Sequence, residues 1–157
     1  MRDKLNALPD DELIHAAIEY IAEKVGDDEE RRLAVLNALP EGLRAFFAVW
    51  LVDAELKNGG FDQYFWNNGD NAATAAVGGF RFFGFEEHAA LMEEALAIRQ
   101  RQRASIASFE EEGTLEAFSE ATQQSALGSL DMAYYDLPDI EAILIRFIRE
   151  HPELFAD

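Results

Sequence analysis

The apolar residues of this chain recur with the period of an α-helix. The clearest stripe lies near the C-terminus, where Ile140, Ile143, Leu144, Phe147 and Ile148 are spaced i, i+3, i+4, i+7, i+8. Nowhere do four or more residues alternate between apolar and polar positions with turn signals on both sides, as a half-buried strand would. The sequence predicts an all-α fold. Because no repeat or low-complexity linker interrupts its 157 residues, it also predicts a single compact multi-helix domain over 1–157.

Capping residues give the expected bounds of the helices. A first helix begins at Asp10 and Asp11, which suit an N-cap and a first turn, and it stops at Gly26. Further helices are predicted over 28–38, 40–57 and 86–108, with a short Ala-rich helix before a break at Gly78-Gly79. A helical piece begins at Gly113-Thr114 with Leu115 and Phe118 as anchors, a short helix lies within 125–137, and a last helix follows Pro138 and stops at Pro152.

Composition excludes several classes of protein. The chain has no cysteine, so disulfides, thiolate nucleophiles and sulfur-ligated metal sites are excluded. No apolar run approaches the roughly 20 residues that span a bilayer, and the N-terminus lacks the apolar core of a signal peptide. We therefore expect a cytoplasmic protein with no membrane contact.

Residues 56–71, LKNGGFDQYFWNNGDN, differ from the helical sequence around them. Four aromatic residues lie within six positions and are flanked by Asn and Gly. Such a stretch can bind a base or a sugar by stacking and hydrogen bonding. Alternatively, Phe61, Tyr64, Phe65 and Asn68 share one face of a short helix that docks back after a Gly-Gly corner, with the Asn side chains satisfying open backbone groups at helix ends. Helical spacing favours the structural interpretation.

The same stretch carries a family resemblance. Asn58, Gly59, Gly60, Phe61, Gln63, Tyr64 and Phe65 match the signature Asn-Gly-Gly-Phe-x-Gln-aromatic-Phe position for position. The segment GDNAATAAVGGFRFFG follows this signature, and near the C-terminus a proline precedes the apolar stripe of the last helix. With these features, the chain resembles the DMP-type bacterial DNA-mimic proteins. The resemblance implies an all-helical fold. It also implies a homodimer whose carboxylates stand in for phosphates and occupy the DNA site of a helix-turn-helix transcription regulator. For the dimer interface we expect an exposed apolar patch near Phe80, Phe82, Phe83 and Phe85.

No motif for catalysis, a metal or a cofactor is present. His15, His88 and His151 lack the paired spacing of a metal site, and there is no nucleophile elbow and no phosphate-binding loop ending in Gly-Lys-Ser/Thr. We therefore expect no enzyme, no metal and no cofactor.

Charge is the strongest functional signal. Asp and Glu total 31 against 13 Lys and Arg, a formal net charge of −18, which opposes direct binding to nucleic acid and attracts basic proteins. The basic run RQRQR (Arg99, Arg101, Arg103) falls late in a helix, where the macrodipole favours it. Beyond it, nine acids without one base form a predicted partner-binding surface: Glu110, Glu111, Glu112, Glu116, Glu120, Asp131, Asp136, Asp139 and Glu141. A second acidic cluster is Asp27, Asp28, Glu29 and Glu30.

These observations leave three function classes open. The first is a DNA mimic that binds a basic DNA-binding protein, such as a helix-turn-helix regulator, and blocks its access to DNA. The second is an immunity-like stoichiometric inhibitor of a basic toxin or nuclease. The third is a small-molecule-binding protein that uses the aromatic residues of 61–66.

Overall fold

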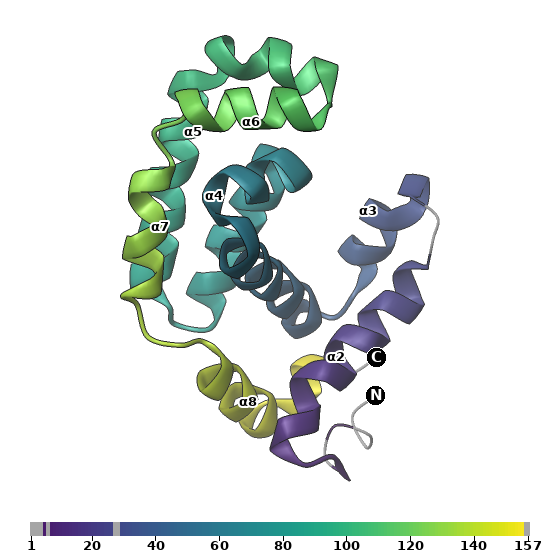
Figure 1. Cartoon of the computed structure of the whole chain (residues 1–157). Helices are drawn as coiled ribbons and strands as arrows, with labels where there is room; N and C mark the ends of the chain where they lie inside the picture. Colours follow the sequence, from purple (N-terminus) through teal and green to yellow (C-terminus); the bar gives the residue numbers. More distant parts are fainter. Residues whose placement is uncertain (1–4, 6, 27–28, 156–157) are drawn as a thin grey trace. The chain divides into compact units, whose positions relative to one another are not determined.

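A computed structural model describes residues 5, 7–26 and 29–155 of the chain, without the side chains of 29–33 (Figure 1). The described residues form helices and no strand, so the all-α prediction is confirmed. The helices are α2 (Asp10–Val25), α3 (Glu29–Ala38), α4 (Glu41–Phe82), α5 (Glu86–Glu112), α6 (Leu115–Gln124), α7 (Gly128–Tyr135), α8 (Glu141–Glu150) and the 3-10 helix η1 (Pro152–Phe155). They fall into two compact units, one of residues 1–49 with 139–157 and one of residues 50–138. The prediction of a single domain over 1–157 stays a prediction.

The first unit joins the two ends of the chain. Helix α2 packs against α3 and α8, and the apolar stripe of α8 buries Leu144 and Ile148 as its spacing predicts. Arg149 of α8 reaches the N-terminal segment. Its guanidinium donates to the carbonyl oxygens of Leu5 and Leu8 and to the Asp10 carboxylate. These contacts hold the start of α2 to the C-terminal helix.

The second unit contains most of α4 together with α5, α6 and α7. Helix α5 packs against both α6 and α7 (Figure 1). Its buried residues include Ala89, Met92, Ala95, Arg99 and Ile106, an approximately helical stripe that contains one cation. All of the signature residues lie in this unit.

Helix α4 is broken at glycines. Gly60 has φ 77° and Gly69 has φ 72°, conformations that L side chains rarely adopt, and Gly59 is also non-helical. The predicted corner at 58–60 is therefore confirmed. The predicted break at Gly78-Gly79 is wrong, because the helix continues to Phe82. The neighbouring Ala76 and Phe80 are fully buried, and burial outweighs the cost of a helical glycine, about 1 kcal/mol.

The α5–α6 junction also differs from expectation. Helix α5 extends past 108 to Glu112, and Thr114 caps α6 by accepting a hydrogen bond from the backbone N–H of Ala117 at 3.1 Å. The prediction that Leu115 anchors this helix is wrong, since its exposed fraction is 78%. Leu115 is the first residue of α6, and the buried face of that helix is made by Ala117 and Ala121 instead.

The Phe-rich segment at the end of α4 belongs to the core. Phe80, Phe83 and Phe85 are buried and Phe82 is half-buried, so the expected exposed patch for a dimer interface is wrong. The rings of Phe80 and Phe85 both contact the imidazole of His88, with centroids 5.3 and 5.2 Å away. These aromatic contacts stabilise the turn between α4 and α5 and bury its Phe side chains.

Candidate partner-binding surface

The amides of the signature stretch converge on one carboxylate. Gln63 Nε2 donates to Glu55 Oε2 at 2.7 Å, and Asn67 Nδ2 lies 3.1 and 3.2 Å from the two Glu55 oxygens. Asn68 Nδ2 donates to Glu55 Oε1 at 3.4 Å and to the backbone oxygen of Tyr64 at 3.0 Å. The prediction that the Asn side chains of this stretch satisfy backbone groups holds only for the bond from Asn68 to Tyr64. The others cross the Gly59-Gly60 corner and fix the angle between the two arms of α4.

The aromatic residues of the stretch are mostly core. Phe61, Tyr64 and Phe65 are buried on one face, as helical spacing predicts, and burial raises the pKa of the Tyr64 hydroxyl. Trp66 points elsewhere, stays half-buried and makes an edge contact with Phe118 of α6, with ring centroids 5.2 Å apart. Of the four aromatic rings, only Trp66 is therefore in a position to meet a ligand.

Asp131 supports the corner from α7. Its Oδ1 accepts a hydrogen bond from the backbone N–H of Phe61 at 2.9 Å, which satisfies a donor left open by the break in α4. A side chain at Gly60 would collide with the same carboxylate. Asp131 belongs to the predicted acidic surface, and the structure gives it a structural contact.

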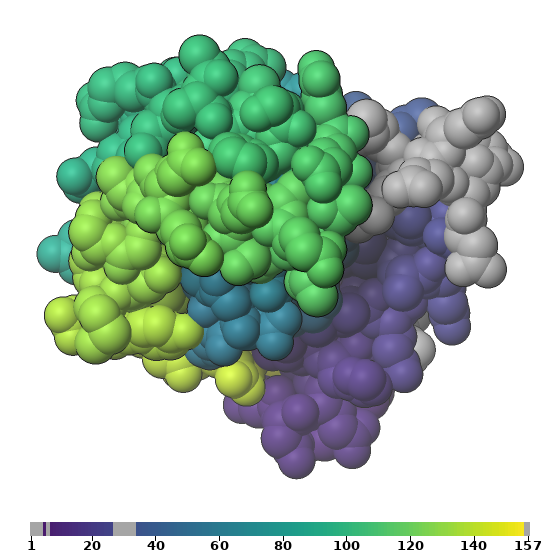
Figure 2. Space-filling model, turned by 45° about the horizontal axis from the view of Figure 1, so that its top comes forward, coloured from purple at the N-terminus to yellow at the C-terminus, as the bar shows by residue number. Residues whose placement is uncertain are grey.

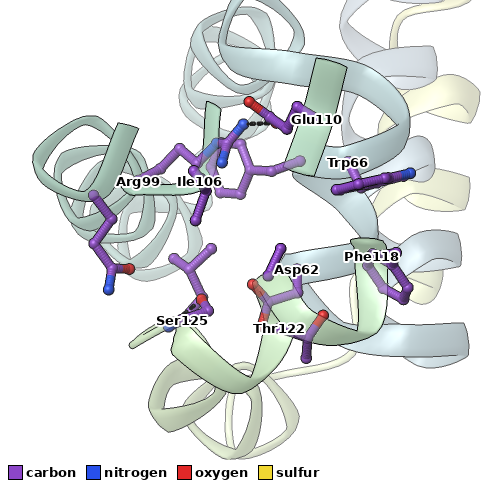
Figure 3. Close-up of a pocket in the computed structure, with 12 residues that line it drawn as sticks. Asp62, Trp66, Arg99, Ile106, Glu110, Phe118, Thr122 and Ser125 are labelled. Carbon is purple, nitrogen blue, oxygen red and sulfur yellow. Dashed lines mark hydrogen bonds and ion pairs between the residues drawn. The ribbon is translucent and has the colours of Figure 1, made fainter. Parts of the chain in front are cut away.

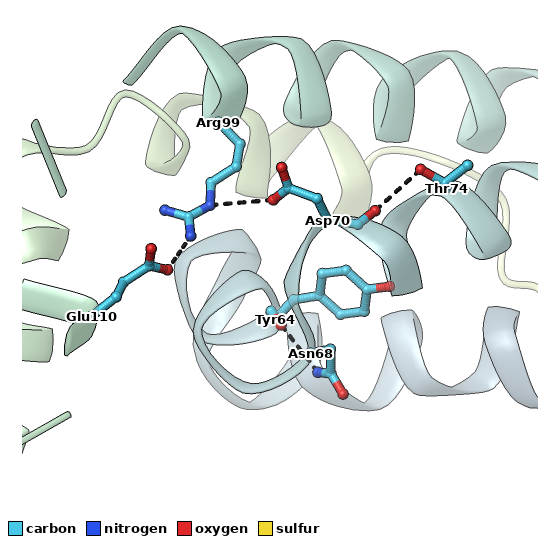
Figure 4. A network of polar contacts seen from close by, with 6 residues as sticks. All are labelled: Tyr64, Asn68, Asp70, Thr74, Arg99 and Glu110. Atoms are coloured by element: carbon cyan, nitrogen blue, oxygen red, sulfur yellow. Dashed lines mark hydrogen bonds and ion pairs between the residues drawn. The ribbon is translucent and has the colours of Figure 1, made fainter. Parts of the chain in front are cut away.

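Arg99 is a buried cation, although its place in the sequence indicated only an interaction with the helix dipole. Its exposed fraction is 8%, and its Nη2 forms an ion pair with Glu110 Oε1, while Nε lies 3.7 Å from Asp70 Oδ1 (Figure 4). The guanidinium also lies over the ring of Phe65, 5.8 Å from its centroid. Two turns after Met92, Arg99 continues the buried stripe of α5, and that position was the signal that could have identified it. Glu110, another predicted surface residue, is half-buried by this pairing.

A narrow pocket lies beside Arg99. It has a volume of about 20 Å³, room for about one water molecule, and Asp62, Trp66, Ile106, Phe118, Thr122 and Ser125 surround it (Figure 3). Burial raises the pKa of the Asp62 carboxyl, and a hydrogen bond with Ser125 opposes that shift. The pocket is too small for a metabolite, so it does not support the small-molecule function.

The structure brings part of the predicted acidic surface together. Glu111 and Glu112 end α5, and Glu116 and Glu120 lie one turn apart on α6. All four side chains are exposed, and none forms an ion pair with a described residue. Glu112, Glu116 and Glu120 are spaced i, i+4, i+8 in the sequence, which predicts one row on a helix, but Glu112 belongs to α5 and the other two to α6. The late α5 and α6 surface, green in Figure 2, faces the viewer in that figure.

The other predicted acids lie elsewhere. Asp136 is exposed at the end of α7, whereas Asp139 and Glu141 are exposed residues of the first unit. Asp27 and Asp28 lie outside the described residues. Glu29 and Glu30 begin α3, and their side chains also lie outside the description. We use the name acidic surface below for Glu111, Glu112, Glu116 and Glu120.

The histidines and carboxylates do not form a metal site among the residues described. No group of three or more His, Asp or Glu side chains there could hold an ion. His15 is exposed and lies 3.1 Å from Glu19, whereas His88 is buried. Within the described part of the chain, no helix is long and apolar enough to cross a membrane.

Fold and surface together define an all-helical, strongly acidic protein with a glycine corner stabilised by buried polar contacts. A family model described as DMP19-like protein matches residues 37–151, which include the corner, the buried arginine and the acidic surface. The chain therefore belongs to the DMP19-like protein family. No curated protein and no solved structure matches the chain.

Proposed function

We propose that this chain is a DNA mimic of the cytoplasm, which binds a basic DNA-binding protein, such as a helix-turn-helix regulator, and blocks its access to DNA. The observation that carries the proposal is the run from Glu110 to Glu141, with nine acids and no base, of which Glu111, Glu112, Glu116 and Glu120 are exposed on late α5 and on α6. Membership of the DMP19-like family supports it.

The spacing of the acids suits this role. Glu116 and Glu120 are separated by one helical turn, so their Cβ atoms lie roughly 5 to 6 Å apart. A cleft that binds B-DNA is built to meet about one negative charge per 1.7 Å of helix axis. Closely spaced carboxylates engage the same Lys and Arg side chains. Each exposed contact contributes only about 0.2 to 1 kcal/mol, so binding depends on several acting together.

The proposed action needs no catalysis, metal or cofactor. It needs a large negative field, which the net charge of −18 supplies, and a fold that holds the acids in place. Late α5 and α6 are fixed by the Thr114 cap and by packing of α6 on α5.

A homodimer is part of the proposal, as the family resemblance implies. Its interface would have to avoid the acidic surface, because two subunits of this charge repel each other. Phe80, Phe83 and Phe85 at the end of α4 are buried and are not available for it. Light scattering at moderate salt tests this part, and a monomer at high concentration would contradict it.

Capture from a native lysate at low salt, followed by stepwise elution with salt, tests the proposal. We expect a basic DNA-binding protein that elutes as salt rises and whose binding to the chain is competed by its own DNA site. Capture of a basic toxin or nuclease that ignores DNA competition would favour the inhibitor function instead.

A further inference from the structure

An open groove lies next to the acidic surface. Its volume is about 440 Å³, and it is formed by residues of the signature stretch on one side and of the α5–α6 junction on the other: Asn58, Gln63, Trp66, Asn67, Gly113, Thr114, Leu115 and Phe118. Trp66 and Phe118, side by side in Figure 3, make its apolar wall together with the exposed side chain of Leu115. A half-buried tryptophan beside a leucine that is 78% exposed forms a local apolar surface on a highly charged protein.

The polar wall of the groove is held in a fixed orientation. Gln63 and Asn67 direct their amide N–H groups at Glu55, which as a carboxylate only accepts hydrogen bonds. The Thr114 hydroxyl is likewise held, because it donates to Glu112 Oε1 and accepts from the Ala117 N–H. The polar groups of this wall are therefore ordered before an occupant arrives.

Charge indicates which occupant the groove favours. None of the residues that line the groove is a cation, and Leu115 lies between Glu112 and Glu116 in sequence, both exposed. Lys and Arg side chains donate hydrogen bonds and carry the charge complementary to these acids.

We propose that this groove binds a basic protein segment with one apolar side chain, which packs against Trp66, Leu115 and Phe118 while flanking Lys or Arg residues meet Glu112 and Glu116. The assignment rests on the proposed function, because it gives the basic partner an anchoring point beside the acidic surface. Contacts between exposed charges weaken as salt rises, whereas apolar burial does not. The groove thus supplies the salt-resistant part of the affinity.

A pair of peptides tests the groove without any reference to DNA. The probes are acetyl-KRLRK-amide and acetyl-KRSRK-amide, which differ only in the central apolar side chain. Nuclear magnetic resonance would follow the indole N–H signals of Trp66 and Trp50 during titration at 0.3 M salt. We expect the leucine peptide to shift the Trp66 signal and leave Trp50 unchanged, and the serine peptide to shift neither. Equal shifts with both peptides, or no shift with either, would overturn the proposal.

Variants of the whole chain test the groove in the complex with its protein partner. Leu115→Ser should raise the dissociation constant roughly tenfold, because burial of one leucine side chain contributes about that much to binding. It should leave the dependence of the dissociation constant on salt unchanged. Met132→Ser is the matched control, since Met132 on α7 is 68% exposed and lies outside the groove. Glu116→Gln should instead reduce the salt dependence. Full affinity in Leu115→Ser, or an equal loss in Met132→Ser, would refute the groove, whereas a partner that ignores DNA competition would refute only the proposed mimicry.

Discussion

The carboxylate of Asp131 accepts a hydrogen bond from the backbone N–H of Phe61, 70 residues earlier, and occupies the space that a side chain at Gly60 would need. One contact thereby fixes the corner of α4 against α7. A glycine is needed at position 60 for two separate reasons. The backbone has a positive φ, and an added Cβ would lie 2.5 Å from Asp131 Oδ2.

Replacement of Gly60 separates these two reasons. Gly69→Ala, at a similar φ and ψ but with open space around it, should lower the free energy of unfolding by about 2 kcal/mol, because φ 72° with ψ −177° is a conformation essentially restricted to glycine. Gly60→Ala should cost about 4 kcal/mol, because Asp131 has to move and give up its bond to Phe61 as well. Chemical denaturation measures both. In the Asp131→Ala background the two glycine substitutions should cost nearly the same, and an unchanged difference would show that the collision is not the cause.

Arg99 should contribute to stability far more than the neighbouring surface arginine. Arg99→Met removes the ion pair with Glu110 and the approach to Asp70, and we expect a loss of roughly 2 kcal/mol. The loss is moderated because both carboxylates keep some contact with solvent. Arg101→Met, an exposed control on the same helix, should change stability by less than about 0.5 kcal/mol. Equal effects in thermal unfolding would contradict the buried role of Arg99.

His88 should make the stability of the second unit depend on pH. Burial lowers the pKa of His88 below its ordinary value of 6.5, and its hydrogen bond with the Pro138 backbone and the charges of Glu87 and Asp53 oppose the shift. Below pH 6.5 the unfolded chain takes up a proton that the folded chain resists, so this part of the stability is present above that pH and is lost on acidification.

Denaturation at a series of pH values checks this prediction. His88→Phe should remove this part of the decline in the free energy of unfolding below pH 6.5. The exposed control His15→Gln should retain it. A parent-like decline in His88→Phe would assign the acid sensitivity to other groups.

The helical class and most helix ends followed from the sequence because they depend on local rules. The α8 stripe and the stops at Gly26 and Pro152 are examples. The predicted break at Gly78-Gly79 is wrong because two helical glycines destabilise the helix by less than the burial of Ala76 and Phe80 stabilises it. The predictions of a buried Leu115 and of an exposed Phe-rich patch are wrong for a related reason. Exposure depends on which neighbours a residue meets, and a single stretch of sequence does not record them.

The site could be predicted in part. The structural interpretation of Phe61, Tyr64 and Phe65 followed from their spacing, but the convergence of their neighbouring amides on Glu55 joins positions on two arms of a broken helix. The charge run identified the acids of late α5 and α6. It did not separate Glu110 and Asp131 from the exposed acids. These two residues make internal contacts, and the sequence does not show which acid meets a partner in the fold.

Competition with DNA for the partner is a direct test of the proposed mimicry. Glu112→Lys, Glu116→Lys and Glu120→Lys together would be compared with Glu23→Lys, Glu94→Lys and Glu150→Lys, which change the net charge by the same amount at exposed positions outside the acidic surface. Circular dichroism would establish that both variants keep the fold. We expect that the first variant no longer displaces DNA from the partner, while the second does so almost as well as the parent. Displacement by the first variant at the parent's concentration would contradict the proposed mimicry.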